Sequence, residues 1–272
     1  MGEASRRVLQ VSDSHLSPGA PHADEQWDAV LAHVEATQPD LVIHTGDISA
    51  HGADGAADLR HARRRLDELT VPWLAVPGNH DIGDAQPTNH PIDDERRSRY
   101  ADAFGDARWT TDLGGWRLVG IDAQTLLSDL PAAQDEWAWL EAALAADGPV
   151  GLFLHRPVRP WRADTPDEPR RYASGIGRRR LGALLAAAPV RLVGSGHVHQ
   201  WWAGELDGAQ HVWAPSTWAV LPDQIQPVIG SKVAGVVELV LHGDGTAEPS
   251  FVRPAGVTDL CLDVDFPSPY SD

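Results

Sequence analysis

The sequence contains very little cysteine and lysine, and little positive charge overall. Its 272 residues include one cysteine, Cys261, and one lysine, Lys232. A single cysteine excludes a disulfide framework within these residues and a zinc site built from thiolates. Acidic residues outnumber basic ones by 39 to 22, for a formal net charge of −17. Because proteins that track a nucleic-acid backbone usually carry a basic face, we expect a small substrate and no long nucleic acid as a partner.

Long apolar runs are also missing. No stretch of about 18 apolar residues occurs, which predicts no membrane-spanning helix and no membrane partner. Met1–Gln10 lacks the apolar core of a secretory signal, so we expect a cytoplasmic location. Hydrophobic residues make up 42% of the chain, enough for the core of a globular protein. We expect one domain over residues 1–254 and an acidic tail over 255–272, either an extended strap or a loose end.

Five short apolar runs each lead into polar residues that could bind a metal ion. Short apolar runs bounded by glycine or proline are typical of buried strands. The runs and the residues that follow them are 7–12 before Asp13 and His15, 40–45 before Gly46 and Asp47, 71–76 before Gly78–Asp81, 150–154 before His155, and 190–195 before Gly196–His199.

Helical patterns separate these runs. Apolar residues recur at helical spacing over Glu25–Thr37, Gln134–Ala145 and Leu181–Ala188. Alternating strands and helices predict a largely parallel sheet, whose ligands bind beyond the carboxyl ends of the strands. Strands alone follow His199, at 200–206, 210–214, 233–241 and 246–252. We expect these late strands to form a second, more antiparallel sheet packed on the first.

The strand-end residues suit a two-metal hydrolytic site, which needs oxygen and nitrogen ligands, a bridging anion and an open position. Asp13 and His15 are spaced to reach one ion. His197 and His199 would point to the same side of an extended strand, or to neighbouring ions if the strand twists. Each pattern alone has a plain structural explanation, such as a turn or a buried histidine. Five of them in this order favour a metal site.

The series D13-S-H15, G46-D47, G78-N-H-D81, H155 and G196-H-V-H199 resembles the calcineurin-like metallophosphoesterase superfamily. Within it, the chain most resembles the class III cyclic-nucleotide phosphodiesterases and related glycerophosphodiesterases. Gln134–Glu141 is similar to their Q-x-x-W-L helix, and Ala214–Thr217 to the segment after their last histidine motif. The likeness covers roughly residues 6 to 253. Arg156 departs from the pattern, because many relatives carry a second histidine or another residue there.

The resemblance implies a four-layer α/β/β/α sandwich of two mixed sheets flanked by helices. It also implies a pair of divalent ions, manganese, iron or zinc, and a ligand set without thiolate does not select among them. The ligands of the first ion would be Asp13, His15 and His199, those of the second would be Asn79, His155 and His197, and Asp47 would bridge the two.

The expected activity is metal-dependent hydrolysis of a small phosphodiester by a hydroxide that the dinuclear centre activates. The substrate would be a 3′,5′-cyclic nucleotide such as cAMP, or a glycerophosphodiester. His80 is the candidate general acid, and Asp81 either fixes its tautomer or stabilises the turn. Asn79, His80 and Arg156 are candidate substrate contacts. The alternatives are a phosphomonoesterase or a short-end nuclease using the same site, and a protein-binding scaffold, which would have no need of intact ligands.

Two further features bear on the substrate. Residues 156–180 contain eight arginines and form either a solvated loop or a lid whose arginines or Trp161 contact the substrate. Four tryptophans follow the last histidine motif; core packing explains most of them, and one or two could stack on a nucleobase. These four are Trp201, Trp202, Trp213 and Trp218. The sequence leaves open which diester is cleaved and which metal pair is native. It also leaves open the oligomeric state, and a homo-oligomer is one possibility.

Overall fold

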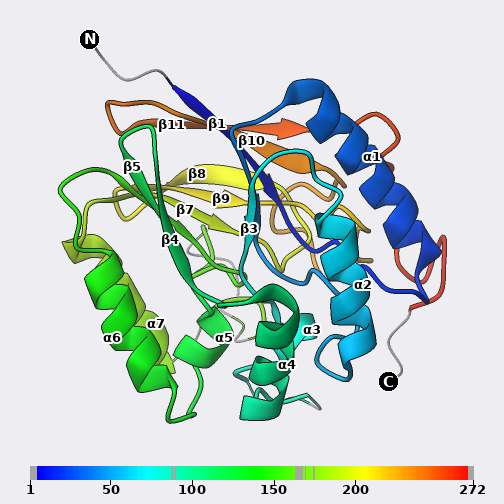
Figure 1. The fold of residues 1–272 in the computed structure, drawn as a ribbon, viewed down its shortest axis with the longest axis horizontal. Helices are drawn as coiled ribbons and strands as arrows, with labels where there is room; N and C mark the ends of the chain where they lie inside the picture. The colour runs from blue at the N-terminus through cyan, green and yellow to red at the C-terminus, as the bar shows by residue number, and fades with distance from the viewer. Residues whose placement is uncertain are drawn as a thin grey trace.

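The computed structural model describes residues 5–86, 88, 90–162, 168, 170–173 and 175–268. Two mixed β-sheets pack face to face, and helices cover their outer faces (Figure 1). In spatial order the first sheet consists of β11 (Ala247–Val252), β10 (Val236–Leu241), β1 (Arg6–Val11), β2 (Leu41–His44) and β3 (Trp73–Ala75). The second consists of β4 (Trp109–Leu113), β5 (Trp116–Gly120), β6 (Val150–Phe153), β7 (Val190–Ser195), β9 (Ala209–Trp213) and β8 (Trp202–Leu206).

Three hydrophobic cores separate the four layers. The first lies between the β1 sheet and the helices α1 (Pro21–Thr37) and α2 (Ala56–Leu66), and includes the fully buried Trp27. The second lies between the β6 sheet and the helices α6 (Ala133–Ala143) and α7 (Gly175–Ala187). The third fills the space between the sheets and includes the fully buried Phe153. The predicted α/β/β/α sandwich is therefore confirmed.

Three further helices complete the fold: α3 (Asn79–Ile82) and α5 (Ala123–Leu126) are single turns, and α4 (Asp94–Phe104) is as long as α2. The sequence patterns did not predict α2, α3, α4, α5, β4 or β5. Among the described residues, no helix combines the length and the apolar character needed to cross a membrane.

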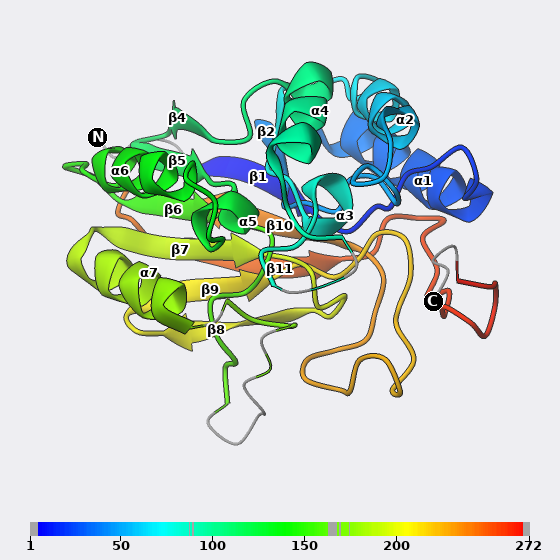
Figure 2. The ribbon, with the colours of Figure 1, turned by 90° about the horizontal axis from the view of Figure 1, so that it is seen from below.

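The expected division into an early and a late sheet is wrong. The late strands β10 and β11 extend the first sheet, where β10 pairs antiparallel with β1. The late strands β9 and β8 extend the second, where β9 pairs parallel with β7 (Figure 2). Burial decides this pairing, because Val237 and Leu239 of β10 point into the core between the sheets. Each late strand thus covers an open sheet edge, which leaves fewer unpaired backbone groups.

The described part of the C-terminal tail packs against the domain as a strap. Val257 and Leu262 are buried in the first core. The tail runs beside α1 (red beside blue in Figure 1), where Gln26 hydrogen-bonds both the carbonyl and the N–H of Thr258. Residues 269–272 lie outside the described part of the chain.

Candidate metal centre

The strand ends that carry the predicted ligands meet at one edge of the sandwich. The pairing of β1 with β2 continues beyond the strands, because the N–H of Asp13 donates to Gly46 O at 3.0 Å and that of His15 to Asp47 O at 3.1 Å. The N–H of His197, after β7, donates to Asp13 Oδ2 at 2.9 Å. Hydrogen bonds from backbone N–H groups thus hold the loops of both sheets together, and the one between the sheets is accepted by the Asp13 carboxylate.

Most of the ligand loops adopt a backbone conformation that side chains other than glycine rarely take. Eight non-glycine residues in the described ranges have positive φ, and five of them are predicted ligands: Asp13, His15, Asp47, His197 and His199. The extended conformation considered for His197 and His199 is therefore wrong. The strand β7 ends at Ser195, and φ is 69° at His197 and 50° at His199. Such strain persists where surrounding contacts enforce it, which is common at functional sites.

Three motif glycines leave room for the ligand side chains. A Cβ atom on Gly78 would lie 2.1 Å from Asp47 Oδ1, and one on Gly196 would lie 2.6 Å from Asp13 Oδ2. At Gly46 it would lie 2.7 Å from His155 Nδ1. All three distances are below any normal contact, so these positions require glycine.

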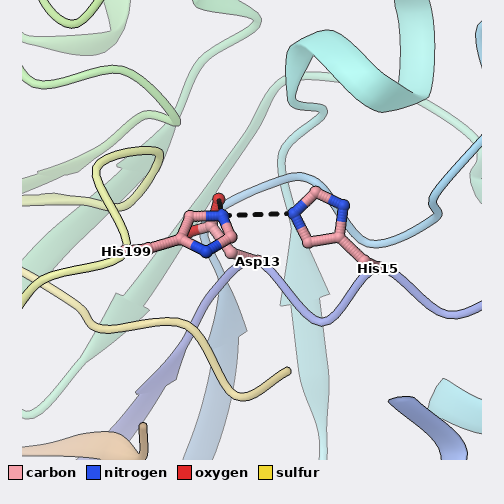
Figure 3. Close-up of side chains that lie close together, drawn as sticks. All are labelled: Asp13, His15 and His199. Carbon is pink, nitrogen blue, oxygen red and sulfur yellow. Dashed lines mark hydrogen bonds and ion pairs between the residues drawn. The ribbon is translucent and has the colours of Figure 1, made fainter. Parts of the chain in front are cut away.

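The predicted ligands form overlapping clusters with Asp47 at the centre. Asp13, His15 and His199 make one group, in which His15 Nε2 lies 3.3 Å from His199 Nε2 (Figure 3). Asp47, His155 and His197 make a second group. A third contains His15, Asp47 and His80, so Asp47 contacts both sides. His197 and His199, the two histidines of the segment Gly196–His199, therefore belong to different clusters.

Backbone carbonyls fix which nitrogen of each histidine faces the centre. Nδ1 of His155 lies 2.8 Å from Thr45 O, and Nδ1 of His199 lies 2.9 Å from Ala219 O. His197 is reversed, with its Nε2 at 2.6 Å from Arg170 O. Each of these nitrogens donates its proton outward, which directs the lone pair of the other nitrogen into the cluster, the usual arrangement of metal-binding histidines.

The negative charges of Asp13 and Asp47 need a bound cation or a protonated histidine to balance them. Burial alone would raise the pKa of Asp47, but the surrounding histidines, His155 above all, lower it well below its usual range. Burial alone would lower the pKa of His155, but the carboxylates of Asp47 and Asp13 outweigh it and raise that pKa to about 9. A bound divalent ion would displace this proton, because imidazole binds metal in its neutral form.

Asn79 supplies a separate test of whether the residues fit metal ions. Its Oδ1 atom is buried and accepts no hydrogen bond from the described residues. A buried carbonyl oxygen without a donor is a good ligand for a hard cation. With two carboxylates, four imidazoles and this amide, the donor set fits two divalent ions.

Asp81 and His80 contribute in different ways. Asp81 is fully buried and accepts hydrogen bonds from the N–H groups of Ile48, Ser49 and Gly78 and from the Ser49 hydroxyl. These contacts support the turn-stabilising alternative for Asp81. The His80 ring is half-buried, and its Nδ1 lies 3.2 Å from Ala50 O.

Three polar side chains that the motif patterns did not indicate brace the ligand loops. His44 and Ser14 hydrogen-bond each other at 2.8 Å beneath the Asp13 and Asp47 loops. Ser216, within the segment 214–217, donates its hydroxyl to Asp13 O at 2.7 Å. A serine between two ligands carries no distinctive sequence signal.

A cavity of about 610 Å³ opens over the clusters, within the size range of small-molecule sites. Of the four late tryptophans, Trp213 and Trp218 are both buried, and of these two Trp218 lies against the cavity. Trp201 and Trp202 line a separate hollow with Trp161. Arg156 is buried in an ion pair with Asp84 at 2.7 Å, and it is not among the described residues that line the cavity. Arg170 and Arg171 line it instead. Residues 163–167, 169 and 174 of the arginine-rich segment lie outside the described ranges.

Comparisons with known proteins agree with this architecture. Residues 6–201 match the family model described as "Calcineurin-like phosphoesterase". The chain is 27% identical over 256 residues to the 3′,5′-cyclic adenosine monophosphate phosphodiesterase CpdA of Escherichia coli (strain K12), covering 90% of this chain and 88% of that protein. It is 29% identical over 205 residues to a probable glycerophosphodiester phosphodiesterase GpdQ of Arcobacter nitrofigilis, covering 71% of each. The fold matches the crystal structure of a dimetal phosphatase from Danio rerio with a TM-score of 0.62 and 15% identity, covering 93% of this chain and 98% of that one.

Proposed function

The chain belongs to the calcineurin-like phosphoesterase family and is a metal-dependent phosphoesterase, and we propose that its substrate is a small phosphodiester. The shared position of Asp47 carries the dinuclear metal centre on which this proposal depends. Its carboxylate takes part in the cluster with His15 and in the cluster with His155 and His197, as a bridging ligand would. Asp13, His15 and His199 would hold the first ion, and Asn79, His155 and His197 the second. We infer manganese, iron or zinc at both positions.

Two such ions would supply the positive charge that binds a phosphate ester and activates the attacking water. The protein contributes fixed ligand loops and a cavity large enough for a small substrate. Asn79, whose buried Oδ1 accepts no hydrogen bond from the described residues, would contact the substrate phosphate as well as the second ion. Arg156 would act at a distance, by holding the loop after His155 through its pair with Asp84.

His80 is the residue that we propose protonates the leaving group. It lines the cavity beside His15, and their ring centroids are 4.9 Å apart. In its imidazolium form, His80 would donate the Nδ1 proton to Ala50 O and hold a second proton at Nε2 for the departing oxygen. The Nε2 proton of His80 would therefore be available for donation near the first cluster.

The two phosphodiesterase relatives support a diester rather than a monoester, since both are named for diester hydrolysis. A monoester dianion resembles the product and would bind both ions as an inhibitor. The cytoplasmic location stays a prediction.

The deciding experiment compares kcat/KM at one Mn²⁺ concentration for cAMP, a glycerophosphodiester, bis-p-nitrophenyl phosphate and p-nitrophenyl phosphate. We expect each diester to exceed the monoester. A clear advantage for the monoester would favour a phosphomonoesterase, and cleavage of DNA or RNA ends alone would favour a nuclease.

A further inference from the structure

The cavity over the two clusters has one apolar side and one charged side. Leu221 and Ile225, backed by the buried Trp218 and Leu262, form an apolar wall. Glu168, Arg170 and Arg171 form a charged rim. Gln226 joins the two sides, since its Oε1 accepts a hydrogen bond from Arg171 Nε at 2.7 Å.

The apolar wall and the charged rim stand over different clusters. The Trp218 ring lies 4.6 Å from the His15 ring and 6.2 Å from the His199 ring, so the wall rises from the first cluster. The rim rises from the second, because Arg170 O accepts the Nε2 proton of His197. A phosphate that spans both clusters would therefore direct its two ester substituents to chemically different surroundings.

Several contacts fix the wall before any substrate binds. The backbone of Val220 pairs with the tail, with Leu260 O accepting from its N–H at 2.8 Å and Leu262 N–H donating to its carbonyl at 3.1 Å. The chain's single lysine, Lys232, donates to Leu221 O at 2.7 Å and pairs with Asp223. The wall is thus built by two segments distant in sequence that are tied together.

Ile225 shows that the wall lacks a covering group. The residue lines the cavity, yet it is 49% exposed, which few large hydrophobic residues are in the described part of the chain. A substrate group that covered Ile225 would remove apolar surface from water and gain about 25 cal/mol per Å² buried.

We propose that the apolar wall binds an apolar or aromatic substituent of the phosphodiester, so that the enzyme favours such diesters over those with polyol substituents alone. This inference rests on the proposed diesterase function. It makes the wall a specificity-determining surface. Diesters with a nucleoside or aryl substituent would be better substrates than glycerophosphodiesters.

The test is a series of O-alkyl methylphosphonates, which keep one negative charge while the alkyl arm grows from ethyl through butyl to hexyl. They compete with bis-p-nitrophenyl phosphate, and Ki is measured for each. Full burial of a methylene gives about fourfold, and we expect about twofold per methylene because one side of the arm still faces water. The analogue with a 2,3-dihydroxypropyl arm should bind more weakly than butyl.

A matched pair of variants locates the effect. Ile225→Ser should flatten the dependence of Ki on chain length. Ile176→Ser should leave it unchanged, because Ile176 is a 77% exposed isoleucine in α7 that does not line this cavity. Ki values that do not change with chain length, or equal slopes in the two variants, would overturn the inference while leaving the diesterase function intact. Absence of diester hydrolysis in the wild type would instead contradict the proposed function.

Discussion

Nε2 of His44 lies 2.8 Å from Oγ of Ser14, and this contact joins two ligand loops. The direction of each hydrogen bond follows from its neighbours. The N–H of Gly46 donates to His44 Nδ1 at 3.2 Å, so a neutral His44 carries its proton on Nε2 and donates it to Ser14. The Ser14 hydroxyl then donates to Ile48 O at 3.0 Å. Burial lowers the pKa of His44 to about 3, which keeps the ring neutral.

Variants of His44 should therefore weaken metal binding. His44→Leu removes both contacts, and we expect at least tenfold lower Mn²⁺ affinity in titration calorimetry, within the range for residues that orient ligands. His44→Gln can keep the donor to Ser14, and His44→Asn the acceptor for Gly46, so each should recover part of the affinity. A lower melting temperature with unchanged affinity would show that His44 serves stability alone.

Gly78→Ala should disable the centre, because the new Cβ would lie 2.1 Å from Asp47 Oδ1 and 2.3 Å from Asp47 N. We expect about 10²-fold lower activity, a typical cost of displacing a site residue by about 1 Å. The matched control is Gly55→Ala, since nothing lies within 4 Å of the position that its new methyl group would take and its φ of −171° suits any residue. Comparable activity in the two variants would contradict the packing argument.

Asp47→Ala should abolish binding of both ions, because Asp47 is the carboxylate shared by the two sides of the site. Elemental analysis after metal loading should find two ions per chain in the wild type and in the control Asp244→Ala, whose exposed side chain lies outside the clusters. Two retained ions in Asp47→Ala would refute the bridging role.

His80→Ala should slow diesters with poor leaving groups by roughly 10²- to 10⁴-fold, the usual contribution of a general acid. Nitrophenyl esters should lose less, because nitrophenolate departs without protonation. Metal content should not change. Equal losses for both kinds of ester would exclude the general-acid role.

Protonation of the buried His211 should lower the free energy of unfolding in mild acid. Burial, with the charge of Arg159 assisting and that of Asp207 opposing, lowers its pKa to about 4. The unfolded chain protonates this histidine below about pH 6.5, whereas the folded one resists until about pH 4. Stability is therefore complete above pH 6.5 and falls as the pH drops towards 4, by roughly 3 kcal/mol at most. Urea unfolding at a series of pH values should show a shallower loss for His211→Gln, and identical slopes would contradict this.

The sequence alone determined the ligand motifs and the strands that carry them. Val190–Ser195 is the strand β7 with the predicted bounds, and the runs before Asp13, Asp47, Asn79 and His155 are strands within three residues of their predicted ends. The reason is local: a short apolar run bounded by glycine or proline and followed by polar residues is typical of a buried strand whose end reaches the surface. Parallel packing then brings those ends to one edge.

Only the tertiary structure decided which partners these elements take. The side of Asp47 on which His197 and His199 lie depends on left-handed backbone angles that contacts from other strands enforce. The pairing of β10 with β1 depends on burial between the sheets. Trp218 lies against the cavity and Trp213 does not, because different segments pack around the two side chains. Hydrophobicity and spacing are properties of a segment, whereas these outcomes are set by residues far away along the chain. The sequence pattern could name the ligands, but packing between distant segments arranged them.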